Sequence, residues 1–174
     1  MKLRVALLQH HATGPSSGEA QQVHELAQGL REQGHTATVT SASPQRIARL
    51  SEDVLRRRGF TGSLTQVPLA LRALRRSDAD VAHAFSVADA AAALRWKHAT
   101  GRPVVFTCLE PIARAGLADR RLRLRLFGAA IEQSDAVVVP DEPAREQLLK
   151  WMAAEAIVID DVSHHQHLYE RLMT

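Results

Sequence analysis

The chain has 174 residues, 45% of them hydrophobic and 24% charged, and a formal net charge of +3. A chain of this length forms one domain with a sizeable core. No apolar run approaches the ~20 residues of a membrane-spanning helix, and the opening stretch is too short for a signal peptide. The small positive charge, without interleaved aromatic and basic residues, argues against a nucleic-acid partner. Because Cys108 is the only cysteine, an internal disulfide is excluded, and we expect a cytoplasmic location.

Short β-rich apolar runs alternate with helical patterns along the chain. Several of the runs are continuously apolar, as strands covered on both faces are. Strands are predicted at Leu3–Leu8, Thr36–Thr40, Leu64–Val67, Val81–Ala84, Val104–Thr107, Ala136–Val139 and Ala156–Ile159.

The helical patterns have clear ends. Helices are predicted at Gln21–Gln33, which stops at Gly34, at Asp89–Thr100, which stops at Gly101, and at Glu142–Ala153, which Asp141 caps. The segment Ser43–Thr65 is expected to form a helix and a mobile loop. Strands alternating with helices indicate right-handed βαβ units. We therefore expect a single α/β domain, with a doubly wound, mostly parallel Rossmann-like sheet and helices on both faces.

Ligands of such sheets bind beyond the carboxyl ends of the strands. The first strand is followed by a small-residue turn into a helix, which offers backbone N–H groups to an anion or a hydroxyl. A plain strand-to-helix turn also needs small residues, so both interpretations stay open. The candidate site residues of this turn and of the later strand ends are Gly14, Ser16, Ser17, Gly18, His83, Thr107, Glu110, Asp141 and Glu142.

Other chemistries are weaker alternatives. Cys108 and His83 could form a thiol–imidazole pair on neighbouring strand ends, but a buried structural cysteine is the better interpretation. His164, His165 and His167 lack the partner ligands of a zinc site and are expected at the surface. The Arg114–Arg125 segment could face anionic lipid, but we favour a solvated helix with Leu122, Leu126 and Phe127 turned inward. No metal, cofactor or catalytic residue is predicted.

Four segments, in order, resemble the N-terminal domain of the GT-B-fold retaining glycosyltransferases of family four. They are Leu26–Val39 (LAQGLREQGHTATV), Asp80–Ala84 (DVAHA), Gly101–Thr107 (GRPVVFT) and Ser134–Val139 (SDAVVV). The family's glycine pair is Ser17-Gly18 here, its Ser-Glu turn is Pro140-Asp141-Glu142, and Leu109 stands where it usually has a sugar-contacting histidine.

The resemblance implies that residues 1–162 form an acceptor-type domain and that 163–174 form the family's closing helix, which packs back on it. It also implies a donor domain, whose Glu-x7-Glu motif does not occur in these residues. We thus expect an acceptor half that is inactive without a donor-domain partner. Its acceptor would be a sugar or a lipid-type molecule. The alternative hypothesis is a non-catalytic assembly module that pairs with a second copy of itself through the acceptor face.

Overall fold

The computed structural model describes residues 2–9, 18–41, 66–109, 121–159 and 161–174. In this part of the chain, parallel strands form one sheet in the order β2-β1-β3-β4-β5-β6. The chain steps from β1 to β2 and then crosses back to β3 on the other side of β1, so the winding direction reverses between β1 and β3. The strands are β1 (Arg4–Gln9), β2 (Thr36–Ser41), β3 (Val81–Ala84), β4 (Val104–Thr107), β5 (Ala136–Val139) and β6 (Ile157–Val158).

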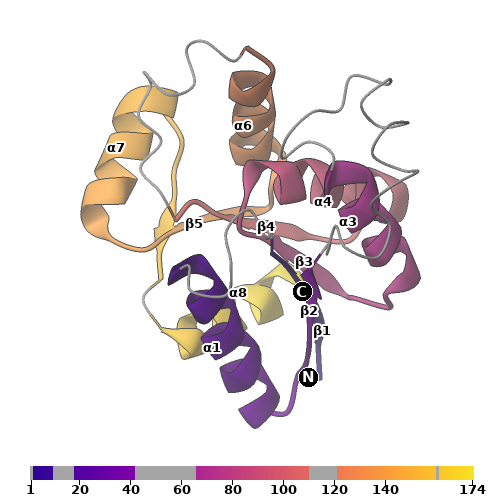
Figure 1. The fold of residues 1–174 in the computed structure, drawn as a ribbon. Coiled ribbons are helices and arrows are strands. Elements are labelled where there is room, and N and C mark those ends of the chain that lie inside the picture. The colour runs from indigo at the N-terminus through magenta and orange to yellow at the C-terminus, as the bar shows by residue number, and fades with distance from the viewer. Residues whose placement is uncertain (1, 10–17, 42–65, 110–120, 160) are drawn as a thin grey trace.

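Helices cover both faces of the sheet (Figure 1). One face carries α1 and α8, and the other carries α3, α4 and α6, with α7 beside β5 and β6. The doubly wound α/β prediction is therefore confirmed. None of the helices described is long and apolar enough to cross a bilayer. The helices are α1 (Gly18–Glu32), α3 (Gln66–Arg76), α4 (Val87–Thr100), α6 (Arg121–Gln133), α7 (Glu142–Met152) and α8 (Val162–Leu172).

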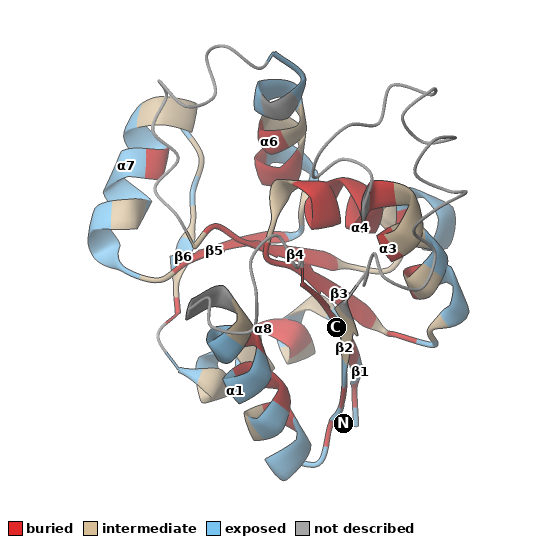
Figure 2. Cartoon of the chain, in the orientation of Figure 1, coloured by how far each residue is buried: buried red, intermediate tan, exposed pale blue. Residues whose placement is uncertain are grey.

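The two faces of the central strands bury different side chains, because successive residues of a strand point to opposite sides. Ala6, Leu8 and Phe106 pack with α4, α6 and α7. Val5, Leu7 and their neighbours pack with α1 and α8. Figure 2 shows the central strands buried along their length. This alternation places His83 and Thr107 on the α1/α8 face, since Val81 and Val105, two residues earlier, belong to that cluster.

Two local predictions are wrong. The predicted strand Leu64–Val67 conflicts with α3, which includes Gln66 and Val67. Val67, Ala70 and Leu74 recur at helical spacing and are buried, and proline is tolerated in a first helical turn, where Pro68 lies. Leu122 is not turned inward but is 53% exposed, whereas Phe127 is fully buried as expected. The whole uncertain segment Ser43–Thr65 and the first part of Arg114–Arg125 lie outside the described residues.

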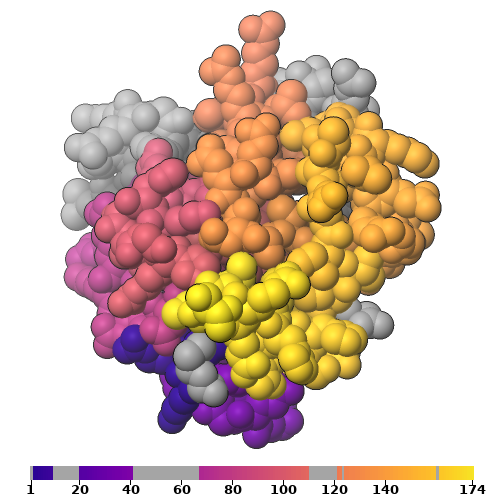
Figure 3. All heavy atoms as spheres, turned by 180° about the vertical axis from the view of Figure 1, so that it is seen from behind, coloured from indigo at the N-terminus to yellow at the C-terminus, as the bar shows by residue number. Residues whose placement is uncertain are grey.

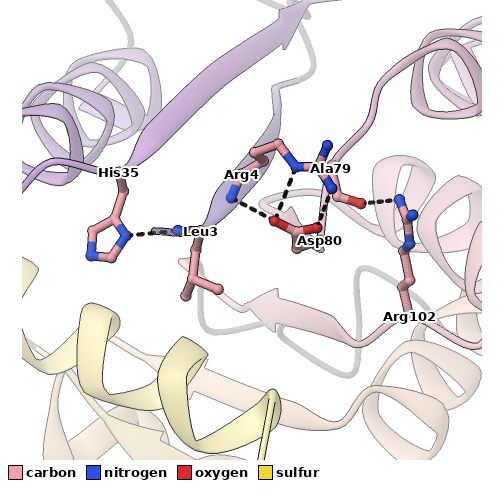
Figure 4. Close-up of polar contacts among 6 residues, drawn as sticks. All are labelled: Leu3, Arg4, His35, Ala79, Asp80 and Arg102. Carbon is pink, nitrogen blue, oxygen red and sulfur yellow. Dashed lines mark hydrogen bonds and ion pairs between the residues drawn. The ribbon is translucent and has the colours of Figure 1, made fainter. Parts of the chain in front are cut away.

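Charged side chains join the amino ends of the strands. The Asp80 carboxylate accepts hydrogen bonds from the backbone N–H of Arg4 at 2.9 Å and from its guanidinium at 2.6 and 3.1 Å (Figure 4). This contact lowers the pKa of Asp80. Arg102 donates to the carbonyl oxygen of Ala79, and the backbone N–H of Leu3 donates to His35 Nδ1 at 3.1 Å. These contacts tie the start of β1 to the segment entering β3 and to the turn before β2.

The last helix rests on the first. The backbone of α1 approaches α8 so closely at Gly29 that a Cβ atom there would lie 2.6 Å from Val162 Cγ1. Leu168 and Tyr169 of α8 are buried in the same cluster as Val23, Leu26 and Leu30 of α1. From behind, the yellow atoms of α8 lie at the lower centre of the molecule, directly above the purple atoms of the early chain (Figure 3).

We expect Gly29→Ala to lower the free energy of unfolding by about 1–3 kcal/mol, because the added methyl group overpacks the α1–α8 contact. The control is Gly128→Ala in α6, whose Cβ would lie 3.7 Å from Met152 Cε. Gly128→Ala causes no overpacking and only replaces glycine by a better helix former, so the free energy of unfolding should rise by up to about 1 kcal/mol. Urea unfolding measures both; equal effects of the two substitutions would contradict the tight α1–α8 contact.

Candidate functional site

A pocket of about 290 Å³ lies at the carboxyl ends of the strands. It borders the ends of β3, β4, β5 and β6, the α1 helix and the first turn of α8, next to the strand β3 at which the winding reverses. This is where ligands of open parallel sheets bind. Its lining residues are Gln22, Glu25, Leu26, Phe85, Thr107, Leu109, Val138, Pro140, Ile159, Asp161, Val162 and His165.

A buried hydrogen-bonded chain lies directly behind the pocket. His83 Nδ1 is 2.6 Å from the Tyr169 hydroxyl oxygen, and His83 Nε2 is 2.5 Å from Thr107 Oγ1. His83 and Tyr169 are fully buried, and Thr107 is buried while lining the pocket. Burial holds the pKa of His83 well below its usual range and raises that of Tyr169. Both side chains are thus neutral, and we name the set Tyr169–His83–Thr107 the buried relay.

His165 links the relay to the pocket. Its ring centroid lies 5.5 Å from that of His83 and 6.2 Å from that of Tyr169. Its Nδ1 is 3.1 Å from the carbonyl oxygen of Asp161, the residue that caps the start of α8. Burial lowers the pKa of His165, an effect that Asp161 opposes. The expectation of surface histidines is therefore wrong for His165, whereas His164 and His167 are exposed.

The predicted site residues fall into four groups. His83 and Thr107 converge as expected, although His83 contacts the pocket only through its neighbours. Asp141 caps α7, accepting from the backbone N–H of Ala144 at 2.8 Å, and Glu142 pairs with Arg145. Gly18 is the first residue of α1. Gly14, Ser16, Ser17 and Glu110 lie outside the described residues, so the acceptor-binding roles of all nine stay predictions.

The thiol–imidazole alternative does not fit the geometry. Cys108 is buried in the cluster on the α4/α6 side of the sheet, whereas His83 faces α1 and α8. Both ring nitrogens of His83 are taken by the relay. A thiolate needs an adjacent base or positive charge to form. The positions of these two side chains favour a structural role for Cys108.

A buried carboxyl group, that of Asp89, lies at the start of α4. Asp89 accepts from the Ser86 hydroxyl at 2.7 Å and donates its backbone N–H to the same oxygen at 3.1 Å. This reciprocal cap satisfies the first turn of α4. Burial raises the pKa of Asp89 to about 6. Asp89 does not line the pocket, so its role is to start the helix that follows β3.

The described pocket lining carries two acidic side chains, Glu25 and Asp161, and no lysine or arginine. Hydrogen bonds from the Ser163 side chain and then from its backbone N–H lower the pKa of Asp161. Among the residues described, no group of three or more His, Cys, Asp and Glu side chains is placed to hold a metal ion. The site thus has an apolar floor with neutral hydrogen-bonding groups and a negative rim.

Sequence reasoning missed Tyr169, His165 and Asp161. Tyr169 lies 86 residues from its partner His83 along the chain, and such a pairing leaves no local pattern. The signal that could have found them is the helical spacing of Asp161, His165 and Tyr169, which places the three on one face of a helix.

Comparisons with known proteins agree with the fold. The family model described as Glycosyltransferase Family 4 matches residues 16–159, and no curated protein sequence matches the chain. The fold is similar to the crystal structure of a putative UDP-N-acetylglucosamine 2-epimerase from Listeria monocytogenes, with a TM-score of 0.55 and 15% identity. That match covers 86% of this chain and 42% of the other. This chain therefore spans less than half the length of that protein, and the likeness shows the fold alone.

We expect stability to depend on pH through His165. Unfolding frees the imidazole to protonate near pH 6.5, whereas burial delays protonation in the folded state. As pH falls below 6.5, the unfolded state binds more protons, and the stabilising contribution is lost. The difference in unfolding free energy between wild type and His165→Gln should be constant above pH 7.5. It should shrink by up to about 1.4 kcal/mol per pH unit below 6.5. A difference that is flat down to pH 5 would contradict the burial of His165.

Proposed function

This chain belongs to Glycosyltransferase Family 4, and we propose that it supplies the acceptor-binding half of a two-domain sugar transferase. The observation that carries the proposal is the pocket at the carboxyl edge of the sheet, beside the point where the winding reverses. An acceptor seated there would face outward from the strand ends, where a second domain could present an activated sugar. A cytoplasmic location is part of this proposal.

The charges of the pocket support the proposal that the acceptor and the sugar donor bind to different domains. A departing nucleoside diphosphate is stabilised by cations placed around it, and the described lining residues include no lysine or arginine. Two carboxylates at the rim would instead repel a diphosphate. We therefore assign the donor nucleotide sugar to a separate domain and expect the 174-residue polypeptide alone to be inactive.

A module that pairs with a second copy of itself is the alternative. The pocket floor offers apolar side chains, among them Phe85, Leu109 and Val138, and face-to-face pairing would cover them. This alternative predicts a concentration-dependent dimer in sedimentation velocity that a charged substitution, Leu109→Asp, dissolves. A monomer at all concentrations would remove it.

The acceptor proposal predicts selective binding. In calorimetric titrations, the polypeptide should bind at least one member of a panel of neutral sugars, and should bind neither UDP- nor GDP-sugars. Incubation of both together should give no transferred sugar above a heat-denatured sample. Tight binding of a nucleotide sugar, or turnover by this polypeptide, would contradict the assignment.

A matched pair of variants locates the binding site. Leu109→Trp fills the pocket and should abolish acceptor binding. Leu122→Trp makes the same change at an exposed position of α6 away from the pocket lining, and should leave binding unchanged. Equal affinity in the two variants would place the acceptor elsewhere.

A further inference from the structure

The direction of the buried relay follows from hydrogen-bond accounting. His83 is neutral, so one ring nitrogen carries a hydrogen and the other accepts one. If Nδ1 carried it, the phenolic hydrogen of fully buried Tyr169 would have no acceptor among the described contacts. Leaving a buried hydroxyl hydrogen without an acceptor is unfavourable, because nothing then offsets its removal from water. Tyr169 therefore donates to Nδ1, and His83 Nε2–H donates to Thr107 Oγ1.

This direction leaves the hydroxyl hydrogen of Thr107 available. Thr107 Oγ1 accepts from His83, and among the described residues it has no second hydrogen-bond partner. Thr107 lines the pocket. The relay thus presents a hydrogen-bond donor at the pocket wall, held in place by two fully buried side chains.

His165 presents the complementary group. The carbonyl oxygen of Asp161 can only accept, so His165 Nδ1 carries the ring hydrogen. The lowered pKa keeps the imidazole neutral. Its titratable neighbours are Asp161 and His164 nearby in the chain, His83 and Tyr169 against its ring, and Glu25 in the pocket lining. Nε2 is then an acceptor, and no described residue donates to it.

We propose that Thr107 Oγ1 and His165 Nε2 flank His83 as a donor and an acceptor that recognise the hydroxyl groups of a neutral polyol. A hydroxyl group both donates and accepts, so it satisfies either partner. The apolar side chains Phe85 and Leu109 contact the carbon skeleton, and Glu25 and Asp161 disfavour an anion. The inference rests on the proposed acceptor function and names its substrate class.

The first test needs no ligand. Nitrogen-15 NMR of the histidine side chains distinguishes the two neutral tautomers. We expect hydrogen on Nε2 of His83 and on Nδ1 of His165. Hydrogen on Nδ1 of His83 would reverse the relay and overturn the proposal.

The second test uses glycerol, with glycerol 3-phosphate as its anionic counterpart. In NMR titrations of the 174-residue chain, glycerol should shift the resonances of Thr107 and His165, and glycerol 3-phosphate should bind more weakly. Thr107→Val and His165→Phe should each weaken glycerol binding about fivefold, the effect of one lost hydrogen bond of about 1 kcal/mol. Thr36→Val, the same change at an exposed position of β2, is the control.

The outcomes separate the inference from the function it rests on. Thr107→Ser keeps the hydroxyl group and should retain glycerol binding. It therefore tests the hydroxyl group even if Thr107→Val fails to fold. Glycerol shifts that survive both pocket substitutions, absent shifts at Thr107 and His165, or tighter binding of the phosphate would overturn the hydroxyl pair. Glycerol binding at the pair without binding of any sugar acceptor would instead overturn the acceptor function and leave the pair intact.

Discussion

The chain of hydrogen bonds from Tyr169 through His83 to Thr107 holds the last helix against two central strands. It joins α8, β3 and β4, which are far apart in the sequence, through side chains that are almost wholly shielded from water. Burial makes this arrangement sensitive to detail, because neutral groups in a dry interior are stable only when their hydrogen-bonding capacity is met. The position of α8 follows from the relay, and so does the pocket wall that His165 and Asp161 provide.

The two edges of the sheet differ in chemistry. At the amino edge, Asp80 binds Arg4, and Asp135 binds both Lys97 and the backbone N–H of Val104. These charged groups satisfy one another and hold the strand entries in register. At the carboxyl edge, the described pocket lining carries acidic and neutral groups without a basic partner. The ion pairs that hold the strand entries thus lie at the amino edge, whereas the described pocket at the other edge is lined without a lysine or arginine.

The sequence predicted the fold well because the information is local. The continuous runs at Val81–Ala84, Val104–Thr107 and Ala136–Val139 became strands with the predicted bounds. The strand prediction was wrong at Val67, because an apolar run next to a proline fits both a strand and a first helical turn. The proximity of His83 and Thr107 could be predicted, because both lie near the carboxyl ends of neighbouring parallel strands, which meet at one edge of the sheet.

The remainder of the site depends on tertiary contacts that no local pattern encodes. His165 and Tyr169 belong to a helix whose partners are set by how α8 crosses α1, and Gly29 permits that crossing. Asp141 was also predicted as a site residue because it follows a strand end, but its carboxylate caps α7. A residue at the correct edge is thus free to bind a ligand only when local structure does not already use it.

The contact between the first and last helices also determines when the pocket can exist during biosynthesis. One part of the pocket wall consists of residues 22–26, and another part comes from residues 161–165. A ribosome releases the chain from its amino end, so the strands and α1 can assemble while the second wall is still unmade. Until α8 emerges, the α1/α8 face of β3 and β4 is open to water or to other chains. Within residues 1–174 the binding site therefore forms only after α8, and a nascent chain lacking these residues would expose its polar relay partners to solvent.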